Sequence, residues 1–296
     1  MANQSTLYIG PAGWSYPDWR GVVYPSRRPS GFSELEYLSR YFNMIELNVT
    51  FYRIPPIEYV RKWSSKVKEH DFQFCVKLGK QYTHSSNMPD KQDTQAFKTS
   101  IRPLVEQDQI GALLLQFPWR FKYSKANLDH LIKLLNRFSE YQPAVEFRHK
   151  SWQCEPVFQT LQEHNAAFVN IDQPVIGKSI EPSANVTAPV GYCRLHGRNY
   201  KTWFEQGAGR DARYDYLYDD RTLNQWAKLV KLVRDSSTKT FVVFNNHFRG
   251  QAVVNALQMK AILEERNISV PPDLKRTFPE LLSISQPEPG ETLSLF

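Results

Sequence analysis

The sequence predicts one α/β domain, a (β/α)8 barrel of the TIM type, from three observations. Eight short runs rich in β-branched and aromatic residues alternate with longer amphipathic stretches along most of the 296 residues. This alternation favours a parallel sheet covered by helices, and eight such units need roughly 250 residues. No glycine-rich dinucleotide turn follows the first run, so a doubly wound open sheet is the less favoured alternative.

The predicted strands are mostly bounded by Gly, Pro or Asn, as expected for buried strands. They cover residues 7–14, 44–52, 72–79, 111–118, 143–149, 167–173, 191–197 and 240–247. Apolar residues at helical spacing predict helices over residues 32–42, 57–70, 127–140, 151–165, 220–235 and 250–266.

Two segments with little helical signal, 174–189 and 199–213, predict irregular long loops after the sixth and seventh strands. The barrel is expected over residues 1–268. Residues 269–296 contain several prolines and predict a C-terminal tail that wraps the surface or stays mobile.

Composition excludes several classes of protein. Apolar residues at 41% and charged residues at 23% exclude a wholly disordered chain, and a mean hydropathy of −0.51 argues against a membrane partner. The N-terminus has no secretory pattern, and the three dispersed cysteines (Cys75, Cys154 and Cys193) indicate reduced thiols, so a cytoplasmic location is expected. The net charge of 37 − 30 = +7 allows an acidic ligand or a nucleic acid as partner and decides neither.

Polar side chains interrupt strands that should be apolar, and they are the main evidence for a site. They include Glu46, Lys77, Gln116, Glu146, Arg148, Asp172, Arg194, His196, Asn245 and Asn246. Because side chains alternate along a strand, Glu46 opposes Ile45 and Leu47, and Asp172 opposes Val169 and Ile171. We expect each apolar set to face the helices and each polar set, Asp172 included, to point into the barrel.

Most of these residues lie near the carboxyl ends of their strands, where barrel enzymes place their chemistry. Three carboxylates and three cations make a paired network feasible, and such a network is a poor way merely to stabilise a fold. The alternative is that some pairs only fill the barrel. The predicted catalytic residues are Glu46, Lys77, Glu146, His196 and Asp172; the predicted substrate-binding residues are Asn48, Tyr52, Gln116, Arg148, Arg194, Asn245, Asn246 and Trp14.

The last predicted helix begins after Asn245, Asn246 and His247. A helix N-terminus after the eighth strand is a common phosphate site in barrels, although the asparagines could simply cap the helix. Trp14 follows the first strand in a cluster with Tyr16 and Trp19, which either stacks on a ligand ring or forms a hydrophobic plug.

The motifs resemble a known family. GWSYPDWRGVVYP, IELNVTFYRIP, FCVKLGKQYTH, LLLQFP, AVEFRHKSW, YCRLHGRN, YDYLY and VVFNNH occur in this order and resemble the "domain of unknown function 72" family of YecE-like proteins over residues 7–262. The resemblance implies a TIM-type barrel and supplies no established reaction. The residues that match positions carried by similar sequences are Glu46, Asn48, Thr50, Tyr52, Lys77, Gln116, Glu146, Arg148, His149, Asp172, Arg194, His196 and Asn246.

The leading hypothesis is an enzyme that acts by acid–base chemistry on a small anionic metabolite, either phosphorylated or not. Glu146 or Glu46 would be the base, His196 or Lys77 the acid or stabiliser, and Arg148 and Arg194 would clamp the anion. Lys77 could instead form a Schiff base.

The alternatives are nucleic-acid or nucleotide binding, metal-assisted hydrolysis, and a non-catalytic sensor. No cofactor is predicted, although Glu46, Glu146, Asp172, His196 and His247 include ligand types for a divalent metal. The sequence does not predict the oligomeric state.

Overall fold

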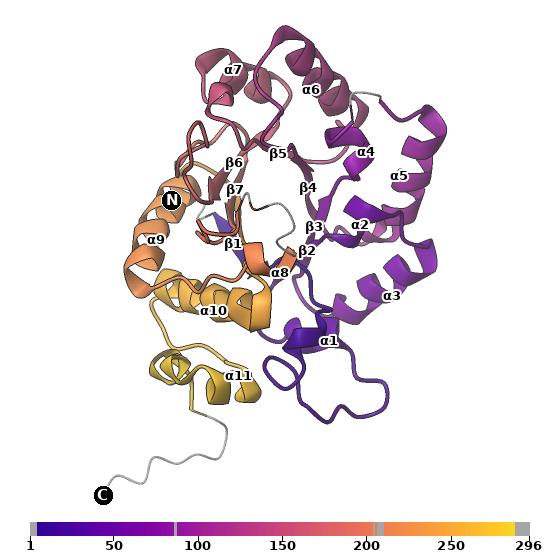
Figure 1. The fold of residues 1–296 in the computed structure, drawn as a ribbon. Coiled ribbons are helices and arrows are strands. Elements are labelled where there is room, and N and C mark those ends of the chain that lie inside the picture. Colours follow the sequence, from indigo (N-terminus) through magenta and orange to yellow (C-terminus); the bar gives the residue numbers. More distant parts are fainter. Residues whose placement is uncertain (1–4, 86–87, 204, 206–209, 288–296) are drawn as a thin grey trace, which may run out of the picture.

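The computed structural model describes residues 5–85, 88–203, 205 and 210–287, and it confirms a barrel of eight parallel strands (Figure 1). The hydrogen-bonded order is β1-β8-β7-β6-β5-β4-β3-β2. The strands are β1 (Thr6–Pro11), β2 (Met44–Leu47), β3 (Gln73–Lys77), β4 (Ile110–Gln116), β5 (Pro143–Glu146), β6 (Ala167–Asp172), β7 (Val190–Leu195) and β8 (Lys239–Phe244).

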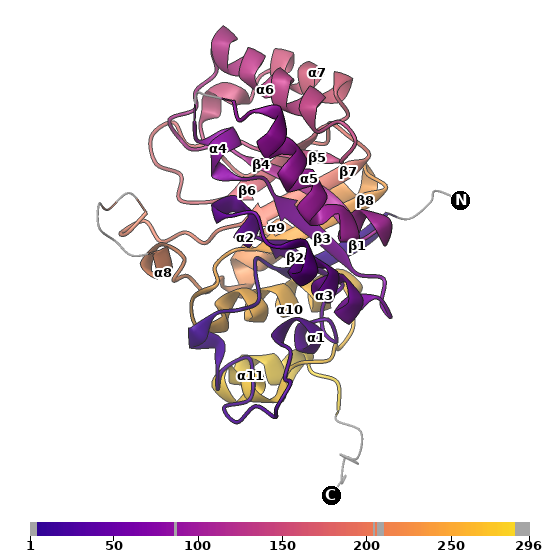
Figure 2. The same cartoon turned by 90° about the vertical axis from the view of Figure 1, so that its right-hand side faces the viewer.

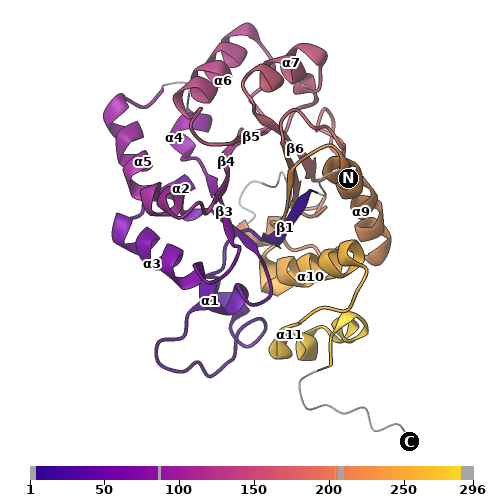
Figure 3. The same cartoon turned by 180° about the vertical axis from the view of Figure 1, so that it is seen from behind.

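Helices surround this sheet on the outside, as Figures 1 and 3 show from opposite ends. The α-helices are α1 (Glu34–Leu38), α2 (Val49–Tyr52), α3 (Ile57–Val67), α4 (Lys80–Thr83), α5 (Lys91–Glu106), α6 (Lys125–Arg137), α7 (Glu155–Glu163), α8 (Arg210–Arg213), α9 (Asp220–Asp235), α10 (Gln251–Glu264) and α11 (Pro272–Thr277). The short 3-10 helices are η1 (Pro17–Trp19), η2 (Lys150–Trp152), η3 (Phe248–Gly250) and η4 (Pro279–Ile284). No helix in the described part of the chain is long and apolar enough to cross a membrane.

The elements differ from the sequence prediction in several places, of which two are the most informative. Residues 49–52 form the helix α2 and do not continue the second strand, which ends at Leu47. The helix α5 was not predicted, although Phe97, Ile101 and Leu104 share one buried face and Asp90 caps its first turn. The predicted loop 174–189 is irregular, and the described part of the loop 199–213 is irregular apart from the short helix α8; residues 204 and 206–209 lie outside the described residues.

The barrel is nearly closed, and side chains bridge the junction between β1 and β2. The Asn43 amide accepts from the backbone of Ile9 at 3.0 Å and donates to the carbonyl of Leu7 at 2.8 Å. A Cβ at Gly10 would lie 2.0 Å from the carbonyl oxygen of Met44, so only glycine allows the two strands to come this close. A single bridge, Ala12 to Glu46, links the strands beyond that point.

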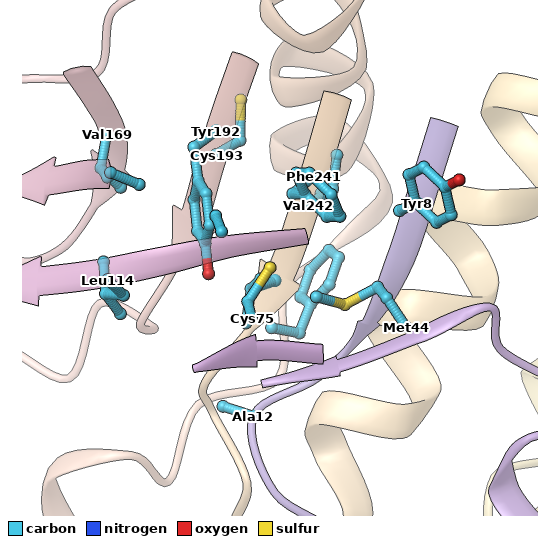
Figure 4. Packing of buried hydrophobic residues seen from close by; sticks show 14 of the residues in the cluster. Tyr8, Ala12, Met44, Cys75, Leu114, Val169, Tyr192, Cys193, Phe241 and Val242 are labelled. Atoms are coloured by element: carbon cyan, nitrogen blue, oxygen red, sulfur yellow. The ribbon is translucent and has the colours of Figure 1, made fainter. Parts of the chain in front are cut away.

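The barrel interior below the carboxyl ends of the strands is apolar. Figure 4 shows side chains of several strands packed there, including Tyr8, Cys75, Leu114, Tyr192 and Phe241. The Phe241 ring stacks on Tyr8 at 5.0 Å and lies 6.0 Å from the Tyr192 ring. These apolar side chains fill this part of the interior, so a site can form only from the polar residues nearer the carboxyl ends of the strands.

The tail folds back onto α10 (Figures 1 and 3). Leu274 of α11 and Leu281 of η4 are completely buried, and Ile268 pairs with Ser285. Residues 269–287 therefore wrap the barrel, which is the first of the two behaviours expected for the tail. The end of the predicted tail, residues 288–296, lies outside the described residues.

Candidate functional site

Arg194 lies at the centre of a buried ionic cluster. The guanidinium of this β7 residue contacts carboxylates from β2 and β5. Its Nε and Nη2 donate to the two oxygens of Glu46 at 2.8 and 2.7 Å, and its Nη1 donates to Glu146 at 2.9 Å. The Tyr192 hydroxyl also donates to Glu46, at 3.0 Å. These side chains are fully buried, and each charge has an opposite partner, as a charge in a protein interior requires.

Arg148 and His196 complete the cluster. Arg148 Nε lies 2.7 Å from Glu146 Oε1, at an angle unsuited to a hydrogen bond, and His196 Nε2 lies 3.2 Å from the same oxygen. His196 also contacts Arg148 Nη2 and the Asn245 amide, both at 3.0 Å. Burial and the Arg148 guanidinium lower the pKa of His196 well below its usual range, so its imidazole is neutral at neutral pH. Burial alone would raise the pKa of Glu146, but Arg148 and Arg194 lower it well below its usual range.

Lys77 is a buried lysine beside this cluster. Its ammonium lies 4.0 Å from the centre of the Phe51 ring, and it makes no hydrogen bond or ion pair with any residue that the structure describes. Burial lowers its pKa from 10.5 to about 7, Arg194 and Arg148 act in the same direction, and Glu46 and Glu146 oppose them. Near pH 7 about half of the Lys77 side chains are therefore neutral amines, the form that acts as a nucleophile or base.

A pocket of about 690 Å³ opens above this cluster. Figure 2 shows α8 beside one end of the barrel. Asp211 and Arg213 of α8, with Tyr214 after it, line the pocket. Its volume lies within the range of about 300–1,000 Å³ that small-molecule sites occupy. The lining residues are Tyr16, Asn48, Tyr52, Lys77, Arg194, Asp211, Arg213, Tyr214, Asn245 and His247.

The prediction that Asp172 points into the barrel is wrong. Its carboxylate accepts from the indole of Trp226 at 2.9 Å, and Trp226 belongs to α9 outside the barrel wall. The hydroxyl of Tyr218 donates to it at 2.6 Å, and Arg198 donates through Nε and Nη2 at 3.0 and 2.7 Å. Asp172 therefore belongs to the layer between the strands and α9, and it holds both ends of the β7–α9 segment.

Asn246 is also placed away from the pocket, contrary to the prediction. Its amide donates at 2.8 Å to the carbonyl of Tyr216 and to the side chain of Asn255 on α10. Near the start of α10, where an anion was expected, the backbone N–H of Arg249 donates to the Asp18 carboxylate at 2.6 Å. A carboxylate of the protein thus already lies beside this helix N-terminus.

The other predicted binding residues are divided between the pocket and its surroundings. Asn48, Tyr52 and Asn245 line the pocket. Gln116 donates to the neighbouring carbonyl of Phe117 at 2.8 Å and is not among the lining residues. Trp14 lines a separate cavity that adjoins the pocket.

Several residues of the site were not predicted from the sequence. Tyr192 could have been found, because it lies two residues before Arg194 and therefore on the same face of the strand. Phe51 lies in a segment that was predicted as strand. Arg213 and Tyr214 reach the pocket from the long β7–α9 segment, for which no periodic pattern in the sequence indicates a position.

The possible metal ligands do not converge. Asp172 lies outside the barrel wall, and the His247 ring stacks on Tyr16 at 4.5 Å. Over the described ranges no group of three or more His, Cys, Asp or Glu side chains is arranged to hold a metal ion.

The fold and the site define a TIM-type barrel protein with a charge-paired pocket at the carboxyl ends of its strands. Within this class, the chain belongs to the family described as "Protein of unknown function DUF72", whose model matches residues 8–279. The family resemblance noted in the sequence is therefore confirmed.

The relatives support this membership. The UPF0759 protein YunF of Bacillus subtilis (strain 168) is 30% identical over 272 residues, which is 87% of this chain and 95% of YunF. YecE of Escherichia coli (strain K12) is 32% identical over 145 residues, 48% of each chain.

Solved structures of DUF72 family proteins share the whole barrel. The protein from Thermotoga maritima has 36% identity and a TM-score of 0.77, covering 88% of this chain and 99% of its own. The protein from Enterococcus faecalis has 25% identity and a TM-score of 0.77, with 88% and 96% covered. The family has no established activity, so a function must be argued from the site.

Proposed function

We propose that this protein is an enzyme that acts on a small anionic carbonyl compound by acid–base chemistry, with the Lys77 amine as its reactive group. The observation that carries the proposal is a buried lysine that lines a pocket, has no counter-ion among the described residues and has a pKa of about 7. A lysine whose pKa is lowered in this way is suited to attack a carbonyl carbon or to accept a proton next to one.

Lys77 fits the role of base better than the two glutamates do. Glu46 and Glu146 are held by Arg194, and the lowered pKa of Glu146 makes it a weak proton acceptor. The carboxylates instead fix the guanidinium below the pocket. His196 is neutral and buried, and it serves as a hydrogen-bonding partner within the cluster.

The covalent route balances without any further reagent. The neutral Lys77 amine adds to the carbonyl carbon, and the carbonyl oxygen leaves as water after it has taken up two protons. One of those protons comes from the amine nitrogen and one from solvent, which leaves a protonated imine. The positive nitrogen can then accept electrons from a neighbouring C–H or C–C bond, as a lyase or an isomerase requires.

Arg213 is the best-placed residue for the anionic end of the substrate. Arg148 and Arg194, for which this role was first considered, are both paired with glutamates. Arg213 lines the pocket and donates only a long 3.4 Å bond to the carbonyl of Glu205, while its buried Nε has no hydrogen-bond partner in the structure as described. A guanidinium in this state suits a carboxylate or phosphate.

Reductive trapping tests the proposal. The protein is incubated with borohydride and, in separate reactions, pyruvate, glyoxylate, 2-oxoglutarate or dihydroxyacetone phosphate, and the labelled peptides are identified by mass spectrometry. We expect a Lys77 adduct with at least one of these compounds, with labelling that rises with pH around a midpoint of about 7.

The matched control is Lys80→Met, which removes an exposed lysine three residues away and should leave the labelling unchanged. Lys77→Met should abolish it. Labelling spread over surface lysines, or equal labelling of the Lys77→Met protein, would contradict the proposal.

A further inference from the structure

A second cavity, of about 450 Å³, adjoins the Lys77 pocket on its β1–β2 side. The two share Tyr16, Asn48 and Tyr52 as lining residues, so a single molecule could extend from one to the other. Unlike the first pocket, the second has no charged side chain in its lining. The remaining lining residues are Gly13, Trp14, Ser15, Leu47, Val49 and Trp63.

Aromatic rings dominate the walls of this cavity. The Trp14 and Trp63 rings meet edge to face, with centres 5.4 Å apart and planes inclined by 80°. Tyr52 stands at the boundary between the two cavities, and 63% of its surface is exposed. Such a surface is suited to a flat, uncharged ring, because aromatic side chains bind ring faces by stacking.

Asn48 supplies a side-chain amide to the lining of the cavity. It stands at the N-cap position of α2, yet its side chain makes no capping hydrogen bond. Its Oδ1 is buried and has no hydrogen-bond partner among the residues described. Leaving a buried amide oxygen without a hydrogen bond is unfavourable, so the position is better explained by a ligand that donates to it.

We propose that this cavity binds a planar heteroaromatic ring that carries an N–H donor next to an acceptor, the edge that a nucleobase presents. The side-chain amide of Asn48 pairs with this edge through Oδ1 and Nδ2, the two-point pairing that asparagine makes with adenine. Trp14, Trp63 and Tyr52 hold the ring by its faces and edges.

If the ring cavity and the Lys77 pocket bind one molecule, an extension that rests on the proposed function, the substrate has two parts. Its ring lies in the second cavity, and its anionic carbonyl end reaches Lys77 and Arg213. The ring site itself does not depend on chemistry at Lys77.

Binding of free bases tests the ring site. Adenine and purine, each methylated at N9 so that only the N6/N7 edge can pair, are titrated into the full-length protein by calorimetry, with D-glucose as a non-aromatic ring. Purine lacks the exocyclic amine and therefore one half of the pairing edge. We expect saturable binding of adenine, at least fivefold tighter than that of purine, and no heat from glucose.

Variants then locate the site. Asn48→Ala should weaken adenine binding about tenfold and purine binding much less, because it removes the amide that forms both hydrogen bonds with adenine. Tyr52→Ala should weaken both, whereas Tyr59→Ala, at another exposed tyrosine, should change neither. Unfolding curves of the variants check that each is folded.

The same titration on Lys77→Met separates this proposal from the previous one. Adenine binding should persist in that variant, so a failure of carbonyl trapping leaves the ring site standing. The ring site is overturned if no base binds saturably, if glucose binds and the bases do not, or if folded Asn48→Ala binds adenine as tightly as the unaltered protein.

Discussion

Two buried carboxylate centres lie on opposite sides of the same barrel wall. Inside, Glu46 and Glu146 share Arg194 beneath a pocket. Outside, Asp172 collects hydrogen bonds from Trp226, Tyr218 and Arg198 in the layer under α9. All three carboxylates are completely buried and paired, and all lie on strands.

The difference between the centres is what each one positions. The interior centre fixes a guanidinium and lies beside Lys77, which has no counter-ion in the part of the chain that the structure describes. The exterior centre holds Arg198 and Tyr218, which begin and end the segment carrying Arg213. A buried charged residue in a barrel strand therefore indicates a site only if its side chain is known to lie on the inner face of the strand.

The largest effect expected is that of Arg194→Met on stability. The substitution leaves Glu46 buried with only the Tyr192 hydroxyl and deprives Glu146 of one of its two arginines. Removing one partner of a buried ion pair costs about 3–5 kcal/mol, which denaturant unfolding should detect as a loss of free energy of unfolding.

A double variant sharpens this test. Glu46→Gln combined with Arg194→Met removes charges of both signs, so it should lose less stability than the sum of the two single variants. Additive losses would mean that the interior centre is solvated and not a coupled pair.

Asp172→Asn should have a smaller effect on stability and a distinct local one. The amide keeps the shape of the side chain but removes the negative charge opposite Arg198 and one acceptor, a loss of about 1–3 kcal/mol. Hydrogen exchange over residues 198–218 should become faster, because both ends of that segment lose an anchor. Residues 174–189 provide the internal reference. Unchanged exchange over 198–218 would show that other contacts hold the segment.

The smallest effect is the pH dependence contributed by Lys77. Its pKa is about 7 in the folded protein and 10.5 in an unfolded chain, so between these values the unfolded state binds more protons. The free energy of unfolding should rise with pH in this window, by about 1 kcal/mol from pH 7 to 8, relative to Lys77→Met. If the free energy of unfolding changed equally with pH in both proteins, the pKa of Lys77 would not be lowered by folding.

The order of the strands could be predicted from the sequence, but the face that each strand turns toward the barrel interior could not be predicted for every strand. Alternation placed Glu46, Glu146 and Arg194 correctly, because the outer faces of their strands are apolar. It failed for Asp172, because β6 is followed by an irregular loop and not by a helix. The backbone of a coil needs hydrogen-bond partners, and Asn170 pairs with both the N–H and the carbonyl of Asn185. Asn170 also accepts from the Ser183 hydroxyl, so this strand presents its polar face outward.

Other features depend on contacts between distant segments. The β-branched and aromatic residues 49–52 favour a strand locally, yet they fold as α2 and place Phe51 against Lys77. The segment that carries Arg213 ends at Tyr218, whose hydroxyl donates to Asp172, a residue 46 positions before it in the chain. No pattern within a local window of sequence contains this information.

The junction between β1 and β2 has a consequence for any molecule that enters the aromatic cavity. Asn43 and one bridge replace the ladder of main-chain bonds found between the other neighbouring strands. Trp14 follows β1 and Asn48 follows β2, so a molecule that contacts both would connect the two strands where the main-chain pairing is sparse. Binding there should therefore raise the thermal stability of the barrel.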